Sequence, residues 1–339
     1  MKPNKNLVNS PSREESTSSA GVIWNTMTLE HQITFHEPIL LNESIQMLLT
    51  DRSGTYVDGT LGGGGHAEAV LKKLRREGRL IGIDRDDEAI AQCRQRLFSY
   101  GDRVSIVQGE IGEVDRLLDD MGVSQISGFL LDLGVSSHQI ETVERGFSYL
   151  SNGPLDMRMD TSSTKSASDV INHYSEKDLT DIFSQYGEER RAHRIARRIV
   201  ERRKRETIET TGELADIVRR VTPYRQQIKT LSRIWQGIRF EVNDELEQLR
   251  MGLEKVYSYL KIDGRIVVIS YESLMDRMVK RFLRGEYATF MKKELPIRRP
   301  NFKFRVLTRR VIRPTEEEVR QNPRARSARL RIGEKIGEA

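Results

Sequence analysis

Apolar and polar positions along residues 55–134 alternate in blocks that predict strands and helices in turn. Four short apolar runs have the length and composition of buried strands: TYVD, RLIGID, RVSIVQG and SGFLLDLG. The segments between them carry apolar residues at helical spacing, and a helix capped by Asn42 is predicted before the first run. This order predicts an α/β fold with a mostly parallel, doubly wound sheet.

The alternation stops after the fourth strand and returns about 100 residues later. Residues 133–160 are dense in Gly, Ser and Pro and predict a loop where a substrate would meet a cofactor. Two helical segments follow at 179–205 and 212–221. We therefore predict a helical subdomain inserted into the sheet domain.

The pattern of a sheet domain resumes beyond this insertion. A long helix is predicted at 241–261, a fifth strand at 264–271 and another helix at 272–283. Two apolar runs near the end of the chain, at 304–312 and 328–336, predict antiparallel edge strands. The last part of the chain is therefore expected to complete the sheet.

A glycine turn separates the first predicted strand from the next helix. Residues 62–65 are four consecutive glycines, and helical spacing resumes near His66. Without Cβ atoms the turn lets a ligand approach closely, and the helix start directs free N–H groups toward it. Gly62, Gly64 and Ala67 also fit a dinucleotide-binding pattern, although such a pattern alone is weak evidence and a flexible glycine loop is the alternative.

Three carboxylates stand at the ends of predicted strands. Asp84 follows the glycine turn by roughly 20 residues, where an acid accepts both hydroxyls of a ribose. Asp58 would repel the pyrophosphate of a nicotinamide cofactor but suits a cationic ligand such as S-adenosylmethionine. Because parallel strands end at one crevice, Asp58, Asp84 and Asp132 predict a cofactor site. A nicotinamide-dependent oxidoreductase stays an alternative supported only by the glycine pattern and Asp84.

Composition narrows the class of protein. The 339 residues include 56 Lys or Arg and 50 Asp or Glu, a net charge of +6 that permits a polyanionic partner. A single cysteine, Cys93, excludes an internal disulfide and a multi-cysteine metal site, and it fits a reducing compartment. No apolar run approaches the roughly 20 residues that span a bilayer. We expect a cytoplasmic protein without a membrane segment or a bound metal, and a disordered tail at 1–33.

Basic residues concentrate in two segments. Residues 188–207 hold nine Lys or Arg against four Glu, and residues 298–313 hold seven basic residues and no acid. A solvated surface would explain either segment alone, but two such segments beside a cofactor crevice favour a phosphate backbone as partner. The candidate RNA-binding residues are Arg190, Arg194, Arg197, Arg198, Arg309 and Arg310.

Several blocks of sequence carry a resemblance to a known family. DGTLGGGGH, LLDLGVSS, ERGFSY, YGEERRAHRIARRIVERR and, most specifically, GPLDMRMD and NPRARSARLR occur in this order. Over residues 36–336 the chain resembles the bacterial small-subunit ribosomal RNA cytosine-N4 methyltransferases. The resemblance implies S-adenosylmethionine as cofactor and N4-methylation of a cytidine in the decoding centre of 16S ribosomal RNA. The implied substrate is the small ribosomal subunit or a late assembly particle.

The resemblance also implies a domain division. We expect a Rossmann-like methyltransferase domain of the class I type, formed by residues 34–142 and 232–339. Residues 143–231 are then the inserted helical substrate-recognition subdomain. An exposed helical insertion would also permit a homodimer.

The family's cofactor-binding residues correspond to a set of positions in this chain. They are Gly64, Gly65, His66, Asp84, Ile111, Asp132 and Gln139.

Catalytic roles are predicted from the chemistry of the amine. The exocyclic amine of cytosine is a poor nucleophile, because its lone pair is delocalised into the ring. An acceptor for its N–H would favour attack on the methyl group. We hypothesise that Asp132, Ser136 and Ser137 supply this acceptor, and that Asn243 and Ser270 orient the base.

The chain departs from the family pattern near the expected substrate side. Glu272 replaces a histidine, Met275 a glutamate and His138 a proline. These changes leave open a second hypothesis, an RNA-binding assembly factor that keeps the cofactor fold but has weakened catalysis. Cytosine-C5 methylation is disfavoured, because it needs a cysteine nucleophile and Cys93 lies within a predicted helix.

Overall fold

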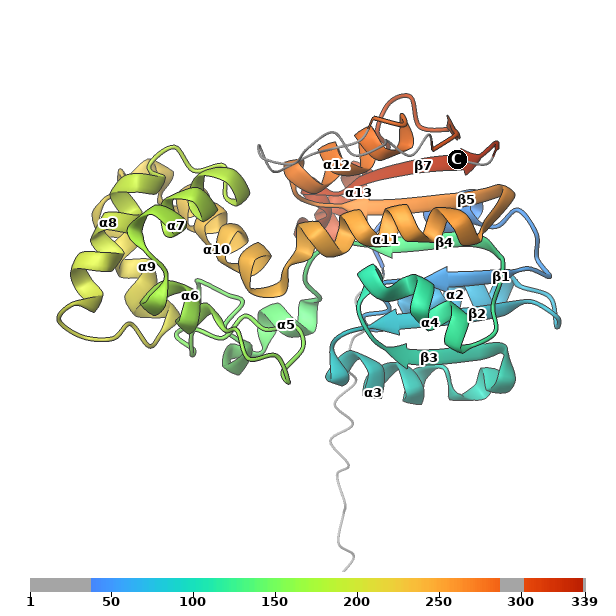
Figure 1. The fold of residues 1–339 in the computed structure, drawn as a ribbon, viewed down its shortest axis with the longest axis horizontal. Coiled ribbons are helices and arrows are strands. Elements are labelled where there is room, and N and C mark those ends of the chain that lie inside the picture. The colour runs from blue at the N-terminus through green and yellow to red at the C-terminus, as the bar shows by residue number, and fades with distance from the viewer. Residues whose placement is uncertain (1–37, 287–301, 338–339) are drawn as a thin grey trace, which may run out of the picture. The chain divides into compact units, whose positions relative to one another are not determined.

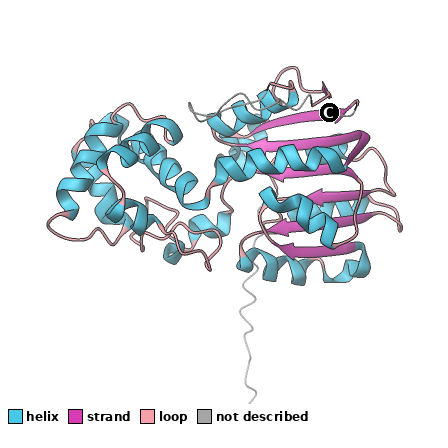
Figure 2. Ribbon diagram, in the orientation of Figure 1, coloured by secondary structure: helices cyan, strands magenta, loops and turns pink. Residues whose placement is uncertain are grey.

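One seven-stranded sheet organises the chain, with strand order β3-β2-β1-β4-β5-β7-β6 (Figures 1 and 2). The computed structural model describes residues 38–286 and 302–337, so the prediction of a disordered tail at 1–33 lies outside the described residues. The strands are β1 Thr55–Asp58, β2 Arg79–Asp84, β3 Val104–Gln108, β4 Ile126–Asp132, β5 Leu260–Ser270, β6 Phe304–Val306 and β7 Arg329–Lys335. The first five run parallel and β7 is antiparallel to both of its neighbours, which confirms the predicted fold class.

Helices cover both faces of the sheet because successive strand residues point to opposite sides. On β4, Phe129 and Leu131 face a core shared with α4, α11 and α12, whereas Leu130 faces a core shared with α1, α2 and α3. Figure 1 shows α4 and α11 in front of the strands. The helices that pack on the sheet are α1 Leu41–Leu48, α2 Gly65–Lys73, α3 Asp87–Arg96, α4 Val114–Asp120, α11 Glu245–Tyr259 and α12 Ser273–Leu283. Both apolar faces of the sheet are therefore covered, as a parallel sheet requires.

A third hydrophobic core lies within the helical segment of the chain. Its buried residues run from Phe147 to Val242 and include none of the strand residues. The helices that form it are α6 Ala167–His173, α7 Glu176–Asp181, α8 Ala192–Arg203, α9 Thr211–Arg220 and α10 Gln227–Asn243. The short helices α5 Ser137–Glu141, within the segment predicted as a loop, and α13 Glu316–Gln321 complete the described elements.

The helix predicted at 241–261 is wrong at its start. Asp244 has a φ of 50° and separates α10 from α11. This break lets Val242 pack in the helical core while Leu246 packs on the sheet. The pattern of apolar residues was continuous across two helices that bury their apolar faces in different cores.

The continuous helix predicted at 179–205 is also interrupted. A π turn, Ile182–Tyr186, follows α7, and Glu188 has a φ of 51° before α8 begins. A Cβ on Gly187 would lie 2.5 Å from the carbonyl oxygen of Arg233, so the interruption allows α10 to approach the chain closely.

Two further predictions, the cap of α1 and the edge position of β7, are wrong. The Asn42 cap is wrong, because α1 begins at Leu41 after Leu40, whose φ is 54°, and has no side-chain cap. The predicted pair of edge strands is wrong for β7, which lies between β5 and β6 and pairs with both. Of the two, only β6 lies at an edge of the sheet, and it covers three residues; beyond it, Ile312 forms an isolated bridge to Leu330 of β7.

The glycine turn after β1 uses conformations that other residues rarely adopt. Gly62 has a φ of 48° and Gly64 a φ of 74°. A Cβ on Gly64 would lie 2.9 Å from the Cys93 sulfur, and the thiol of Cys93 donates to the Gly62 carbonyl at 3.0 Å. Cys93 thus packs beneath the turn.

Substitution of Gly64 by alanine should destabilise the fold. A left-handed conformation costs an L-residue about 1–2 kcal/mol, and the contact with Cys93 adds to it. Thermal or urea unfolding of Gly64→Ala measures the loss. Gly63→Ala is the matched control, since the nearest atom to its Cβ would be Gln92 Oε1 at 3.5 Å. Equal stability of the two variants would contradict this explanation of the turn.

Candidate active site

The strand register brings the three predicted carboxylates together at the carboxyl-terminal ends of β1, β2 and β4. Asp58 on β1 pairs with Gly82 on β2 and with Leu130 on β4. Asp84 and Asp132 therefore each extend two residues beyond Asp58, on either side of it. The structure thus brings the three carboxylates close enough for the charges of Asp84 and Asp132 to act on Asp58, and their role as a cofactor site stays a prediction.

Asp58 is the most deeply buried of these acids, with 1% of its surface exposed. Its Oδ1 accepts a hydrogen bond from the Thr60 backbone N–H at 3.2 Å, whereas its Oδ2 has no hydrogen-bond partner among the described residues. Burial, together with the negative charges of Asp132 and Asp84, raises the pKa of Asp58 to about 7. A buried carboxylate oxygen without a partner fits a cationic group of a ligand.

Asp132 lies between a tyrosine and a histidine. Its Oδ1 accepts a hydrogen bond from the Tyr271 hydroxyl at 3.0 Å, and its Oδ2 lies 3.8 Å from His66 Nδ1. Burial raises the pKa of Asp132 to about 7 and lowers that of His66 to about 4. His66 is therefore neutral at pH 7, and the contact is not an ion pair.

Asp84 holds the glycine turn against the second strand. Its Oδ2 accepts from the Gly62 N–H at 2.7 Å and its Oδ1 from the Asp86 N–H at 2.9 Å. Burial raises the pKa of Asp84. Each oxygen keeps a lone pair for a ribose hydroxyl. Ile111, at the start of the turn after β3, packs against the core on one face of the sheet.

A buried arginine that was not among the predicted site residues, Arg145, connects the loop after β4 to neighbouring segments. Arg145 donates to Asp86 Oδ2 at 2.8 Å and to the Met159 carbonyl at 3.0 Å. The predicted cofactor residue Gln139 donates to the same Asp86 oxygen at 2.7 Å. Only its place in the block ERGFSY pointed to Arg145. The network ties the loop after β4 to the segment beyond Asp84.

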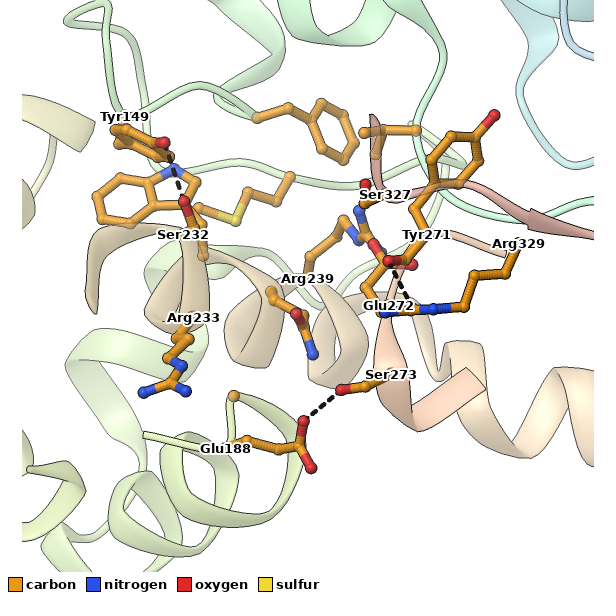
Figure 3. A pocket seen from close by; sticks show the side chains of 16 residues that line it. Tyr149, Glu188, Ser232, Arg233, Arg239, Tyr271, Glu272, Ser273, Ser327 and Arg329 are labelled. Carbon is orange, nitrogen blue, oxygen red and sulfur yellow. Dashed lines mark hydrogen bonds and ion pairs between the residues drawn. The ribbon is translucent and has the colours of Figure 1, made fainter. Parts of the chain in front are cut away.

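A cavity of about 430 Å³ opens beside the acidic crevice (Figure 3). Tyr271 belongs to both sites, since it lines the cavity and its hydroxyl bonds to Asp132. The rings of Tyr149 and Trp235 meet edge to face with centroids 5.7 Å apart, and the Tyr149 hydroxyl bonds to Ser232. Phe147 also lines the cavity. Aromatic walls of this kind suit a planar base.

Charged groups form another wall of the cavity. Arg239 donates to Glu245 and to Glu272, each at 2.7 Å, and all three side chains are largely buried. Burial raises the pKa of Glu245, and Glu272 Oε2 has no hydrogen-bond partner among the described residues. The glutamate at 272 is therefore the partner of a buried arginine. The sequence marked the position as a departure but did not reveal this pairing.

Ser136 and Ser137 lie at the start of α5, directly beyond Asp132 and the turn at residues 133–135. The Ser136 hydroxyl accepts from the Gln139 N–H at 3.1 Å, which closes a capping box. Ser137 is half-buried.

Asn243 and Ser270, the two residues predicted to orient the base, are both buried and do not line the cavity. The Asn243 amide bonds to the backbone of Met157, Met159 and Arg239. Ser270 ends β5 and is 1% exposed. In this structure Asn243 positions the loop at 157–159, and the roles predicted for both residues stay predictions.

The six predicted RNA-binding arginines are all exposed. Arg197 and Arg198 both pair with Glu201 on the same helix, at 3.0 and 2.8 Å. Arg309 and Arg310 lie in the loop after β6.

Residues 38–286 and 302–337 contain no group of three or more His, Cys, Asp or Glu that could hold a metal ion. No helix among them is long and apolar enough to cross a membrane.

Comparison with known proteins decides the family. A sequence model of the MraW methylase family matches residues 33–336. The chain belongs to this family. The chain is 47% identical over 309 residues to Ribosomal RNA small subunit methyltransferase H of Geobacter sp. (strain M21), covering 89% of this chain and 98% of the relative. The protein of the same name from Chlorobaculum parvum is 46% identical over 314 residues, with coverage of 89% and 98%.

Among solved structures, the chain was matched to fibrillarin from Aeropyrum pernix in complex with S-adenosyl-L-methionine, at 7% identity over 86% of this chain and 73% of that chain, with a TM-score of 0.37. Membership of the MraW family makes this chain an S-adenosylmethionine-dependent methyltransferase. The acidic cluster fits that cofactor, because Asp58 Oδ2 is buried without a hydrogen-bond partner among the described residues and S-adenosylmethionine carries positive charge.

The affinity for S-adenosylmethionine should rise with pH between about pH 5.5 and 7. Asp58 and Asp132, with pKa values of about 7, are protonated at the lower pH, and a cationic ligand binds their ionised forms. Each proton released on binding changes the affinity by a factor of up to about ten per pH unit. Calorimetry in buffers of different ionisation enthalpy measures both affinity and proton release.

S-adenosylhomocysteine is the control for this titration. It keeps the amino group and lacks the sulfonium charge, so its affinity should depend less on pH. Identical pH profiles for the two ligands would contradict a role of the carboxylates in binding the sulfonium.

Proposed function

We propose that the protein methylates N4 of a cytidine in the decoding centre of 16S ribosomal RNA. The observation that carries the proposal is the aromatic cavity that shares Tyr271 with an acidic cofactor crevice. Relatives named Ribosomal RNA small subunit methyltransferase H, at 47% and 46% identity, support ribosomal RNA of the small subunit as substrate. The N4 position and the decoding centre rest on the sequence blocks of the family.

The crevice residues would hold the cofactor by charge and by backbone contact. Asp84 would accept the ribose hydroxyls, and the turn at Gly62, Gly64 and Gly65 would admit the ligand without steric conflict. His66 packs beside Asp132, and Asp58 would neutralise the ligand's positive charge. When bound, S-adenosylmethionine supplies a methyl group on a sulfonium, which is transferred by in-line displacement. Catalysis then depends on positioning and on charge complementarity.

Asp132 is placed to act on the amine of the base. Its pKa of about 7 suits a group that accepts a hydrogen bond from the amine and takes up its proton. The Tyr271 hydroxyl fixes the orientation of the Asp132 carboxylate. Ser136 and Ser137 lie on the following turn, where their hydroxyls would supply further acceptors.

The cavity would hold the base after it leaves the RNA helix. Tyr149, Trp235 and Phe147 offer aromatic surface that compensates for lost stacking. Extrusion from a duplex costs a few kcal/mol, which favours a folded cytoplasmic subunit or a late assembly particle as substrate over naked oligonucleotide. In this proposal residues 143–231 form the substrate-recognition subdomain, and a homodimer through that subdomain stays a prediction.

A second candidate function is an RNA-binding assembly factor with weakened catalysis. Glu272 favours it, because this glutamate lines the cavity at a position where the resemblance led us to expect a histidine, and its side chain is engaged by Arg239. Such a factor would bind the cofactor and the subunit without transferring the methyl group.

Methyl transfer to small subunits tests the proposal directly. Subunits from cells that lack the endogenous enzyme are incubated with the protein and methyl-labelled S-adenosylmethionine, and the nucleosides are then separated. Label in N4-methylcytidine is expected. Tight cofactor binding with no label would support the assembly factor, and label in another nucleoside would refute N4 methylation.

Asp132→Asn should lower kcat by about a hundredfold or more, because an amide cannot take up the proton. The comparison variant is Asp84→Asn, which should raise KM for the cofactor and change kcat at saturation little. Steady-state kinetics on small subunits separates the two effects. Full turnover of Asp132→Asn with unchanged cofactor affinity would rule out its role.

A further inference from the structure

The structure distinguishes basic side chains that pair with an acid from those that are available to bind RNA phosphates. The sequence pointed to the basic helix α8, but there Arg197 and Arg198 share Glu201, and Arg202 pairs with Glu206 at 2.8 Å. Acids on or next to the helix therefore neutralise part of its charge, and of its predicted RNA-binding residues only Arg194 has no ion-pair partner among the described residues. Phosphate contacts need cations that are not already paired.

The exposed side of α10 and of the turn before it presents a different arrangement. Arg225 and Lys229 are exposed, follow each other at a spacing of four residues, and have no ion-pair partner among the described residues. Tyr224 and Ile228 lie next to them and are 88% and 73% exposed. We call the residues Tyr224, Arg225, Ile228, Lys229, Ser232 and Arg233 the α10 row.

The α10 row ends at the cavity. Ser232 and Arg233 line it, and Figure 3 shows both on the same helix at the edge of the cavity. The Ser232 hydroxyl donates to the Ile228 carbonyl and bonds to Tyr149, so the aromatic wall is attached to this row. Leu150, which follows Tyr149, is 84% exposed.

The alternation of cations with apolar and aromatic side chains identifies the class of partner. A protein that binds single-stranded nucleic acid combines cations along the backbone with flat side chains on which bases stack. Arg225 and Lys229 supply the cations, and Tyr224 supplies an exposed ring, whereas Arg233 is already paired with Glu189 at 3.5 Å. The cavity at the end of the row has the size and walls for one nucleotide.

We propose that the α10 row binds the RNA strand next to the target nucleotide and directs that nucleotide into the cavity. The proposal rests on the proposed function, since it takes ribosomal RNA as the ligand. Phosphates on one side of the target contact Arg225 and Lys229, and a neighbouring base stacks on Tyr224.

The double variant Arg225→Gln/Lys229→Gln tests the α10 row. Its KM for small subunits should rise about tenfold, with kcat and the affinity for S-adenosylmethionine unchanged. Loss of two phosphate contacts should also reduce the slope of log affinity against log salt by about 1 to 2. Equilibrium binding of labelled protein to small subunits at several salt concentrations gives that slope.

The matched control is Lys177→Gln/Arg219→Gln, which removes the same charge from the same helical segment. Lys177 pairs with Asp181 at 2.7 Å and Arg219 with Asp216 at 2.9 Å, each within its own helix. This control should change KM less than twofold. An equal loss in both variants would overturn the proposal, because it would show a general charge effect.

The outcomes distinguish this proposal from the proposed function. Wild-type KM and wild-type salt dependence in the Arg225/Lys229 variant would overturn the α10 row while methylation stands. If the wild-type protein binds subunits without methylating them, the proposed function fails and the salt slope still decides the row. A fall in kcat or in cofactor affinity of the variant would also overturn the proposal, and thermal unfolding checks that the variant is folded.

Discussion

The burial of uncompensated negative charge at one edge of the sheet is the constraint on which the site depends. Asp58, Asp84 and Asp132 end three neighbouring strands, and burial raises the pKa of each. Isolated buried carboxylates destabilise a fold when they ionise, so their presence signals a cationic ligand. The cluster therefore carries an electrostatic penalty that a bound cationic ligand would relieve.

Buried polar contacts attach the helical segment to the strand ends that carry the three acids, and the cavity lies where the two parts meet. Asn243 fixes the loop at 157–159, Arg145 fixes the loop after β4, and Arg239 links α10 to Glu272, the second residue after β5. Each of these is a buried polar group with several partners. Such contacts are directional, and they hold the cavity walls in register with the crevice more closely than apolar packing would.

Departures from the family pattern acquire a physical meaning in this context. Glu272 forms an ion pair with Arg239, so the change from histidine adds a carboxylate to a buried charged network. His138 contacts Glu88 at 2.7 Å in an exposed position, where its effect on the fold is small. Met275 is buried in the core of the sheet, where a glutamate would need a partner.

The sequence alone determined the order of the elements and the location of the acidic crevice. Local periodicity identifies strands, and the carboxyl ends of parallel strands must meet at one edge, so Asp58, Asp84 and Asp132 could be brought together without coordinates. It could not place the break at Asp244 or the interior position of β7, because those depend on which core each apolar face packs against. Only the tertiary structure decided which cations are free, since Arg197 and Arg198 find a common acid while Arg225 and Lys229 find none among the described residues. Pairing between side chains is a property of their positions in space, whereas charge composition is a property of the chain.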